Sequence, residues 1–294
     1  MKPGTLPRLA AVAALALTLV VGSAARAELF DDVPGGTINW TDGVITVKGT
    51  GVMPEAGSLA QKRMMGYRAA IADAYRKLAE AVDGVRVDAD TTVSNYVTTS
   101  DVVRTQVSAL IKGAQATKTD YKPDGAVEVT LTLDLHGKNR SLASALAATA
   151  NSPAPAASVG VVPVPATPVS LAAATPAPVK EDYTGVIIDA KGLKAEPAMS
   201  PSLLDESGQE LYLADLSVSP DTVIERGLAS YAKSVDEAKT LKTRIGKKPL
   251  ILKAKAVRGP QRADLVLDRA DAGLLLGADQ RKAFLSTLSV VIVL

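Results

Sequence analysis

A helical pattern followed by a strand pattern, over residues 58–93, constrains the fold more than any other part of the chain. Ser58 is a good helix N-cap, and Gln61 three residues later can complete a capping box. Apolar residues then recur at steps of three and four and form one stripe along about six helical turns: Ala60, Met64, Tyr67, Ile71, Ala74, Leu78 and Ala81. Gly84 can end the helix, and the alternation from Val85 to Val93 predicts a strand with one buried face. A helix cannot bury such a stripe alone, so the pattern predicts a helix packed across a sheet.

The flanking segments complete a first domain. Two β-hairpins are predicted, one over residues 37–48 and one over residues 114–136, each with Asp-Gly in its turn. Between them, Ser100 can cap a second helix over residues 101–112. The resulting order, ββαβαββ, predicts an α+β domain in which helices cover one face of a mostly antiparallel sheet.

The rest of the chain divides into three further segments. Residues 1–27 have the basic start, apolar run and Ala25-Arg26-Ala27 site of a signal peptide cleaved after Ala27. The N-terminal domain is then expected over 28–148, followed by a Pro/Ala-rich linker with polyproline II character over 149–181. A smaller C-terminal α/β domain is expected over 182–294. Its predicted strands cover residues 185–190, 249–257, 263–267 and 289–294, and its predicted helices begin at Pro220 and Arg269.

Composition and charge limit the function. Removing residues 1–27 removes three basic residues and no acidic one, so the formal charge falls from +2 to −1. A near-neutral chain argues against nucleic acid as a partner. After residue 27 no apolar run is long enough for a transmembrane helix. The absence of Cys from all 294 residues excludes disulfides, thiolate metal sites and Cys nucleophiles within them.

The motifs that could carry chemistry are incomplete. Gly49-Thr50-Gly51 stands between a strand and a helix, as in a dinucleotide-binding loop, but Pro54 occupies the place of the third glycine. We therefore expect these glycines to allow a sharp bend out of the strand. His136, the only histidine, is expected to be a solvated strand residue, because it has no partners for a zinc site. A nucleophilic Ser motif, G-x-S-x-G, is absent from the sequence. The sequence thus predicts no catalytic residue, cofactor or metal, and a non-enzymatic role.

The charged side of the first helix is the candidate interaction face. Its residues carry both signs: Arg63, Arg68, Asp73, Arg76 and Glu80. Copies of the chain could meet head to tail through such a face, and exposed strand edges offer a second route to pairing. The sequence therefore predicts self-association through the first domain. The alternative is that these charges only keep a monomer soluble.

Several motifs of the first domain together resemble a known family. The motifs are Trp40, Ile45-Thr46-Val47, Gly49-Thr50-Gly51, Arg68-Ala69-Ala70, the run from Asp73 to Leu78, Gly84-Val85 and Asp124-Gly125. Residues 37–136 resemble the domain shared by twenty-kilodalton outer-membrane lipoproteins and the flagellar assembly proteins P and T. The resemblance implies a small envelope protein without catalytic residues. Its flagellar members form or stabilise rings and discs around the basal body.

The resemblance has a second part and one departure. Thr184 to Ala190, Pro197-Ala198-Met199 and Pro201 resemble a C-terminal domain that often accompanies the first in proteobacterial relatives. The lipoproteins carry a lipidated Cys, whereas this sequence has no Cys. Attachment to the membrane is therefore expected to go through a partner.

Taken together, the patterns predict a two-domain, non-enzymatic structural or adaptor protein of a Gram-negative envelope. It is expected in the periplasm, peripheral to the outer membrane, with copies of itself and envelope or flagellar proteins as partners. Two alternatives stay open at this point. One is a periplasmic binding module for a small ligand or for peptidoglycan, and the other is a hydrolase of unknown type.

Overall fold

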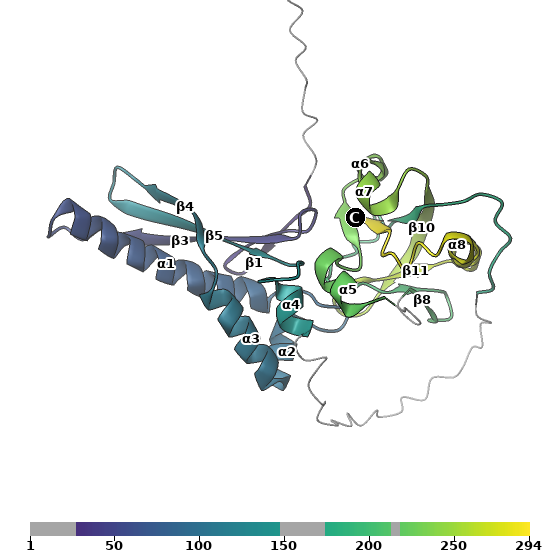
Figure 1. The fold of residues 1–294 in the computed structure, drawn as a ribbon, viewed down its shortest axis with the longest axis horizontal. Coiled ribbons are helices and arrows are strands. Elements are labelled where there is room, and N and C mark those ends of the chain that lie inside the picture. The colour runs from purple at the N-terminus through teal and green to yellow at the C-terminus, as the bar shows by residue number, and fades with distance from the viewer. Residues whose placement is uncertain (1–27, 148–173, 213–217) are drawn as a thin grey trace, which may run out of the picture.

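The computed structural model describes residues 28–147, 174–212 and 218–294 (Figure 1). The predicted signal peptide and most of the predicted linker therefore lie outside the described residues. The first domain contains an antiparallel sheet with the strand order β1-β2-β3-β5-β4. Its strands are β1 (Phe30–Val33), β2 (Gly36–Asn39), β3 (Val44–Val52), β4 (Ala116–Tyr121) and β5 (Ala126–Asp134). Both predicted hairpins are confirmed, since β2 pairs with β3 and β4 pairs with β5.

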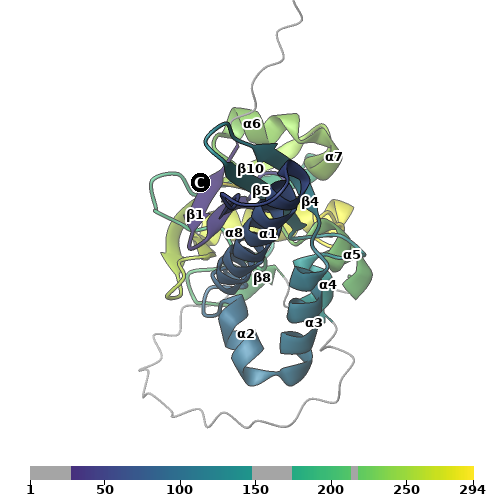
Figure 2. The ribbon, with the colours of Figure 1, turned by 90° about the vertical axis from the view of Figure 1, so that its left-hand side faces the viewer.

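Four helices accompany this sheet: α1 (Leu59–Asp83), α2 (Val93–Thr99), α3 (Asp101–Lys112) and α4 (Leu142–Ala147). Helix α1 lies along one face of the sheet, and α2 and α3 form a helical hairpin that projects away from it (Figure 2). The predicted capping box is present: the Gln61 backbone N–H donates to Ser58 Oγ at 3.3 Å, and Ser58 N–H donates to Gln61 Oε1 at 2.9 Å. The predicted α+β class is confirmed, with helices on one face.

The strand predicted from Val85 to Val93 is wrong. Residues 85–92 instead form a loop that reverses direction, with Val93 N–H donating to Val85 O at 3.0 Å. The Asp88 carboxylate makes the turn, because its Oδ1 accepts from the backbone N–H groups of Asp90 and Thr91. Val85 and Val93, at the two ends of the loop, are both buried. The alternating apolar pattern therefore arises here without a strand. We call residues 85–92 the docking loop.

The predicted bend at Gly49 and Gly51 is also wrong. Strand β3 continues through both glycines to Val52. A Cβ atom on Gly49 would lie 2.2 Å from Ala70 O, and one on Gly51 would lie 2.4 Å from Gly66 O. The glycines therefore allow the backbone of α1 to approach the strand closely.

This close approach moves the buried stripe of α1 from its predicted position. The fully buried residues of the helix are Gly66, Ala70, Ala74, Leu78, Ala81 and Val82. The predicted stripe residues Ala60 and Met64 are exposed, and Tyr67 and Ile71 are half-buried. Small residues thus face the glycines of β3, and the larger apolar residues of the first turns lie outside the core.

The second domain contains a mixed sheet with the order β8-β7-β11-β10-β6-β12-β9. Its strands are β6 (Gly185–Asp189), β7 (Leu203–Leu204), β8 (Glu210–Tyr212), β9 (Ser230–Ala232), β10 (Pro249–Arg258), β11 (Asp264–Leu267) and β12 (Val290–Val293). Its helices are α5 (Pro220–Arg226), α6 (Val235–Thr240), α7 (Lys242–Ile245) and α8 (Arg269–Lys282). Strand β12 is buried along its whole length because it lies between the parallel strands β6 and β9. The predicted strands and helix starts of this domain are confirmed.

The docking loop joins the two domains. Met199 N–H donates to Arg86 O at 3.0 Å, Ser200 N–H donates to Val87 O at 2.7 Å, and Gln261 N–H donates to Ala89 O at 2.8 Å. One cluster of buried apolar side chains extends through both domains. The last residues of the predicted linker, 174–181, lie along α8, where Ala177 N–H donates to Gly273 O at 2.9 Å. The described parts of the chain therefore pack as one unit.

Candidate functional site

Three of the five residues of the predicted interaction face bind one another along α1. Arg76 pairs with Asp73 at 2.9 Å and with Glu80 at 2.7 Å, and Lys77 pairs with Asp73 at 2.8 Å. These pairs are the i,i+3 and i,i+4 contacts that stabilise a helix surface. We call Asp73, Arg76 and Glu80 the charge ladder, because their charges are largely satisfied within the helix.

Asp73 also fixes the helix to the sheet. Its Oδ2 accepts from Thr50 N–H at 3.0 Å, and the neighbouring Lys77 Nζ donates to Lys48 O at 2.9 Å. The Lys77 ammonium and the Thr50 N–H hold the pKa of the Asp73 carboxyl well below its usual range. Asp73 is therefore ionised throughout the ordinary pH range and acts as a link between α1 and β3.

The other two predicted residues, Arg63 and Arg68, lie near the start of α1. The Arg63 guanidinium lies 5.4 Å from the ring centroid of Tyr121, at cation–π distance. The Arg68 side chain is exposed at the edge of a shallow groove. The structure therefore divides the predicted face into two parts, the charge ladder and a separate basic pair.

The basic pair accompanies an exposed apolar surface that the sequence analysis missed. The side chains of Leu59, Met64 and Met65 are 60%, 55% and 57% exposed, and Tyr121 beside Arg63 is also exposed. We call Leu59, Met64, Met65 and Tyr121 the arm tip. The groove here has a volume of about 610 Å³ and is lined by Ala56, Gly57, Ala60, Gln61, Met64, Met65 and Arg68. The adjacent pair Met64-Met65 was the available signal, because successive helical residues point in different directions and cannot share one narrow stripe.

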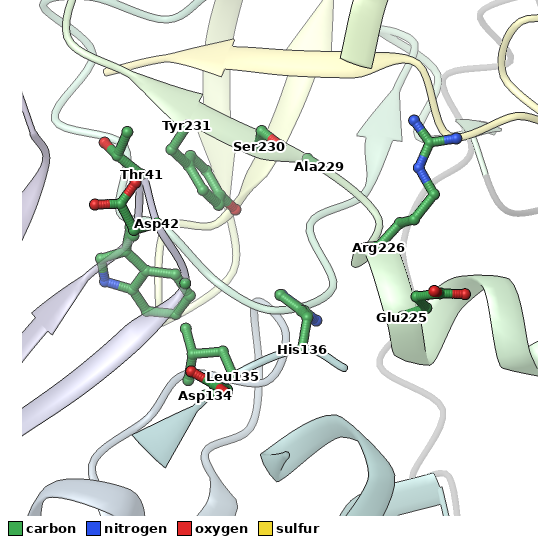
Figure 3. Close-up of a pocket in the computed structure, with 12 residues that line it drawn as sticks. Thr41, Asp42, Asp134, Leu135, His136, Glu225, Arg226, Ala229, Ser230 and Tyr231 are labelled. Carbon is green, nitrogen blue, oxygen red and sulfur yellow. The ribbon is translucent and has the colours of Figure 1, made fainter. Parts of the chain in front are cut away.

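A second candidate site is a pocket between the two domains (Figure 3). Its volume is about 220 Å³. The rings of Trp40 and Tyr231 meet edge to face in its wall, with centroids 5.8 Å apart. The first domain contributes Asp134 and His136, and α5 contributes Glu225 and Arg226. The pocket is smaller than the usual 300–1,000 Å³ of a small-molecule site.

His136 is not the solvated strand residue that the sequence predicts. It follows β5 and packs against Gly227 of the second domain, whose φ is +66° and whose added Cβ would lie 2.6 Å from His136 Nε2. Burial, together with the nearby Arg244 guanidinium, lowers the pKa of His136 to about 4. Its Nδ1 atom is buried without a hydrogen-bond partner among the described residues. The neutral imidazole is thus part of the domain interface.

Comparison with known protein families finds a similarity in each domain. Residues 53–134 match the LPP20 lipoprotein family. The match begins directly after β3, ends with β5 and contains the whole predicted interaction face. It confirms the predicted resemblance to outer-membrane lipoproteins and indicates an envelope-associated protein.

The second domain matches a different model. Residues 185–294 match the second domain of Treponema pallidum Tp0624, a range that begins with β6. A search of curated proteins finds no match to the chain. LPP20 lipoproteins are not a known enzyme family.

Two observations on the described residues bear on membrane and metal sites. Helices in these residues are too short or too polar to span a bilayer. Within the same residues, no three His, Cys, Asp or Glu side chains are grouped closely enough to hold a metal ion. The charge ladder, the arm tip and the domain interface are the surfaces from which a function can be argued.

Proposed function

We propose that this chain is a non-enzymatic structural or adaptor protein of the periplasm that acts at the outer membrane, with the flagellar basal body as the assembly to test first. One observation carries the proposal: the second domain contacts only one end of the first (Figure 1). The outer side of α1 and the edge strand β4 are left open, so that other chains can reach them.

A rigid connection between the domains supports an adaptor role. Domains in one chain usually move relative to each other unless their interface is large and apolar. Here three backbone hydrogen bonds from the docking loop and a continuous apolar core cross the interface. Arg86 adds a hydrogen bond to Pro197 O at 2.8 Å and an ion pair with Glu196 at 3.5 Å across the interface, and its ion pair with Asp31 holds it in place within the first domain. Partners bound to the two domains would be held at a fixed separation.

Self-association is part of the proposal. The charge ladder presents both signs on the exposed side of α1, and β4 has a free edge in the described sheet. A bulge between Ala116 and Lys118 interrupts this edge, which disfavours continuous strand pairing. We therefore place contacts between copies at the charge ladder, in a head-to-tail arrangement.

Single introduced cysteines can test the proposal, because the chain has none of its own. Ala72→Cys, exposed one helical turn before Arg76, places a thiol beside the charge ladder and keeps its three charges, and Lys247→Cys, exposed on the second domain, is the matched control. We expect cross-links in intact cells from position 72 to envelope proteins or to other copies, with the protein recovered in the periplasmic or outer-membrane fraction. Recovery of an uncleaved chain in the cytoplasm would contradict the proposal, and absence from purified basal bodies would remove the flagellar part.

The pocket between the domains favours a second candidate, a binding module for a small polar ligand or a peptidoglycan fragment. The side chains of His136, Glu225 and Arg226, which line the pocket, could orient such a ligand. Soluble peptidoglycan fragments should then raise the melting temperature of the chain but not that of an Ala229→Trp variant, whose side chain fills the pocket. An unchanged melting temperature of the native chain would exclude this candidate for the fragments used.

A further inference from the structure

We propose that the arm tip docks on the surface of an anionic phospholipid bilayer. The inference rests on the proposed envelope function and names a partner for the arm tip, a surface to which that function assigns no role. Leu59, Met64 and Met65 project from the first two turns of α1, and Tyr121 projects from the end of β4. The start of α1 and the turn between β4 and β5 lie at the end of the first domain that is farthest from the second (Figure 1). An exposed apolar surface at such an extremity can reach a membrane without obstruction from the rest of the molecule.

The charge of this end is complementary to an anionic surface. Between Glu55 and Asp73 the chain contains three basic residues, Lys62, Arg63 and Arg68, and no acidic residue. The first turn of α1 carries no acid either, so the positive end of the helix dipole is not opposed there. On the adjacent hairpin Lys118 pairs with Asp120 and Lys122 pairs with Glu128, so Asp124 in the turn and the neighbouring Glu55 are the acidic residues to set against the three basic ones. The excess charge around the arm tip is therefore positive.

The shape of the surface favours lipid over a protein partner. Protein hot spots are usually aromatic or Arg anchors that fit deep, well-packed pockets. The groove beside Met64 and Met65 is instead open and lined mainly by small and flexible side chains. At a bilayer surface, Leu and Met side chains can enter the upper acyl region while Lys and Arg side chains extend to the lipid phosphates. Arg68 follows Met65 by three positions and Met64 by four, so the three side chains share one side of the helix and line the same groove, which fits this geometry.

Flotation with lipid vesicles tests the proposal on the protein purified from the periplasm. We expect it to float with vesicles of phosphatidylethanolamine and phosphatidylglycerol, and to bind phosphatidylcholine vesicles much more weakly. The Met64→Ser/Met65→Ser variant should bind anionic vesicles at least about tenfold more weakly, since two apolar side chains are lost. Ile251→Ser, which removes an exposed apolar side chain on β10, is the matched control and should bind normally.

The electrostatic part has its own pair of variants. Arg68→Glu should weaken binding to anionic vesicles, and added salt should weaken binding of the native chain. Arg104→Glu makes the same change on α3, at an exposed site far from the arm tip, and should have little effect. Circular dichroism would verify that each variant is folded.

A fluorophore on Met65→Cys reports insertion directly, because no other thiol is present. Its emission should shift to the blue with anionic vesicles, whereas the same label on Ile251→Cys should not change. No flotation and no spectral shift would overturn the proposal, as would equal binding of the native chain and the Met64→Ser/Met65→Ser variant. If the arm tip cross-linked to an envelope protein without binding vesicles, the lipid proposal would fall while the adaptor function would stand.

Discussion

At the scale of single residues, the structure depends on side chains that are small or neutral where larger or charged ones would be expected. Gly49 and Gly51 allow β3 to contact the backbone of α1 closely, because they have no Cβ atom. His136 fits the domain interface because it is uncharged. The sequence identified all three residues as unusual, but periodicity and motif spacing cannot reveal a close approach between two elements. Their actual roles depend on contacts with residues 15 to 91 positions away in the sequence.

Gly49→Val should destabilise the first domain strongly. Its Cβ would overlap Ala70 O and Ala74 N, both main-chain atoms that cannot move without displacing the helix. We expect a loss of about 3 kcal/mol or more in the free energy of unfolding, measured by urea denaturation. Thr50→Val, at the next position of β3 with an exposed side chain, keeps the backbone N–H and should change it little. Equal stability of the two variants would disprove the close contact.

His136 should make stability depend on pH. Its pKa is about 4 in the folded chain and 6.5 in a solvated one, so the unfolded state binds the proton first as the pH falls. The stability present above pH 6.5 is therefore lost between about pH 6.5 and pH 4, by about 2 kcal/mol from pH 7.5 to pH 5. His136→Gln should reduce this slope in denaturation curves measured at several pH values. An identical slope in both proteins would show that other groups carry the dependence.

At the scale of the elements, α1 is amphipathic in an unusual way. Its buried side consists mostly of Gly and Ala, and the larger Leu78 and Val82 are buried only near its C-terminal end. Periodicity in the sequence identified the helix, its N-cap and its capping box, because these features are local. It placed Met64 in the core, because a hydrophobic pattern cannot distinguish an apolar residue that packs from one that remains exposed. The docking loop was misread for a related reason: alternating apolar residues also fit a turn whose two ends are buried.

The difference between the predicted and observed stripes can be measured. Leu78→Ala removes a fully buried side chain beneath the sheet and should cost about 3 kcal/mol in unfolding free energy. Met64→Ala removes an exposed side chain at a predicted stripe position and should cost less than about 0.5 kcal/mol. Chemical denaturation of both variants gives the comparison. A large effect at Met64 would mean that this residue is covered in solution, for example by a second copy of the chain.

At the scale of the whole molecule, the connection between the domains is more extensive than the sequence indicates. A Pro-rich segment between two patterned regions predicts independent domains joined by a tether. The described residues instead share one apolar core, and the docking loop supplies backbone hydrogen bonds across the interface. Contacts between distant segments of this kind leave no trace in local composition. The two-domain class was predictable from the sequence, whereas the union of the domains was not.

Proteolysis should reveal this union. After cleavage between residues 148 and 173, we expect the two fragments to elute together in gel filtration, because the interface does not depend on the covalent link. Arg86→Ala removes the hydrogen bond to Pro197 O and the ion pair with Glu196, both of which cross the interface, so it should weaken the association by about 2 kcal/mol. Arg262→Ala is the matched control, because Arg262 also donates to main-chain carbonyls, but within the second domain. Native fragments that separate on cleavage would contradict the shared core.

The position of the docking loop directly after α1 has a mechanical consequence. A helix of 25 residues is a stiff strut about 37 Å long. One end of this strut is the arm tip, and the other leads, through Gly84, into the loop whose backbone bonds hold Met199, Ser200 and Gln261. A pulling force on the arm tip would therefore be transmitted along the helix axis to the second domain, because the loop that follows the helix is hydrogen-bonded to that domain. A chain built in this way can bear tension between a surface at one end and a partner at the other.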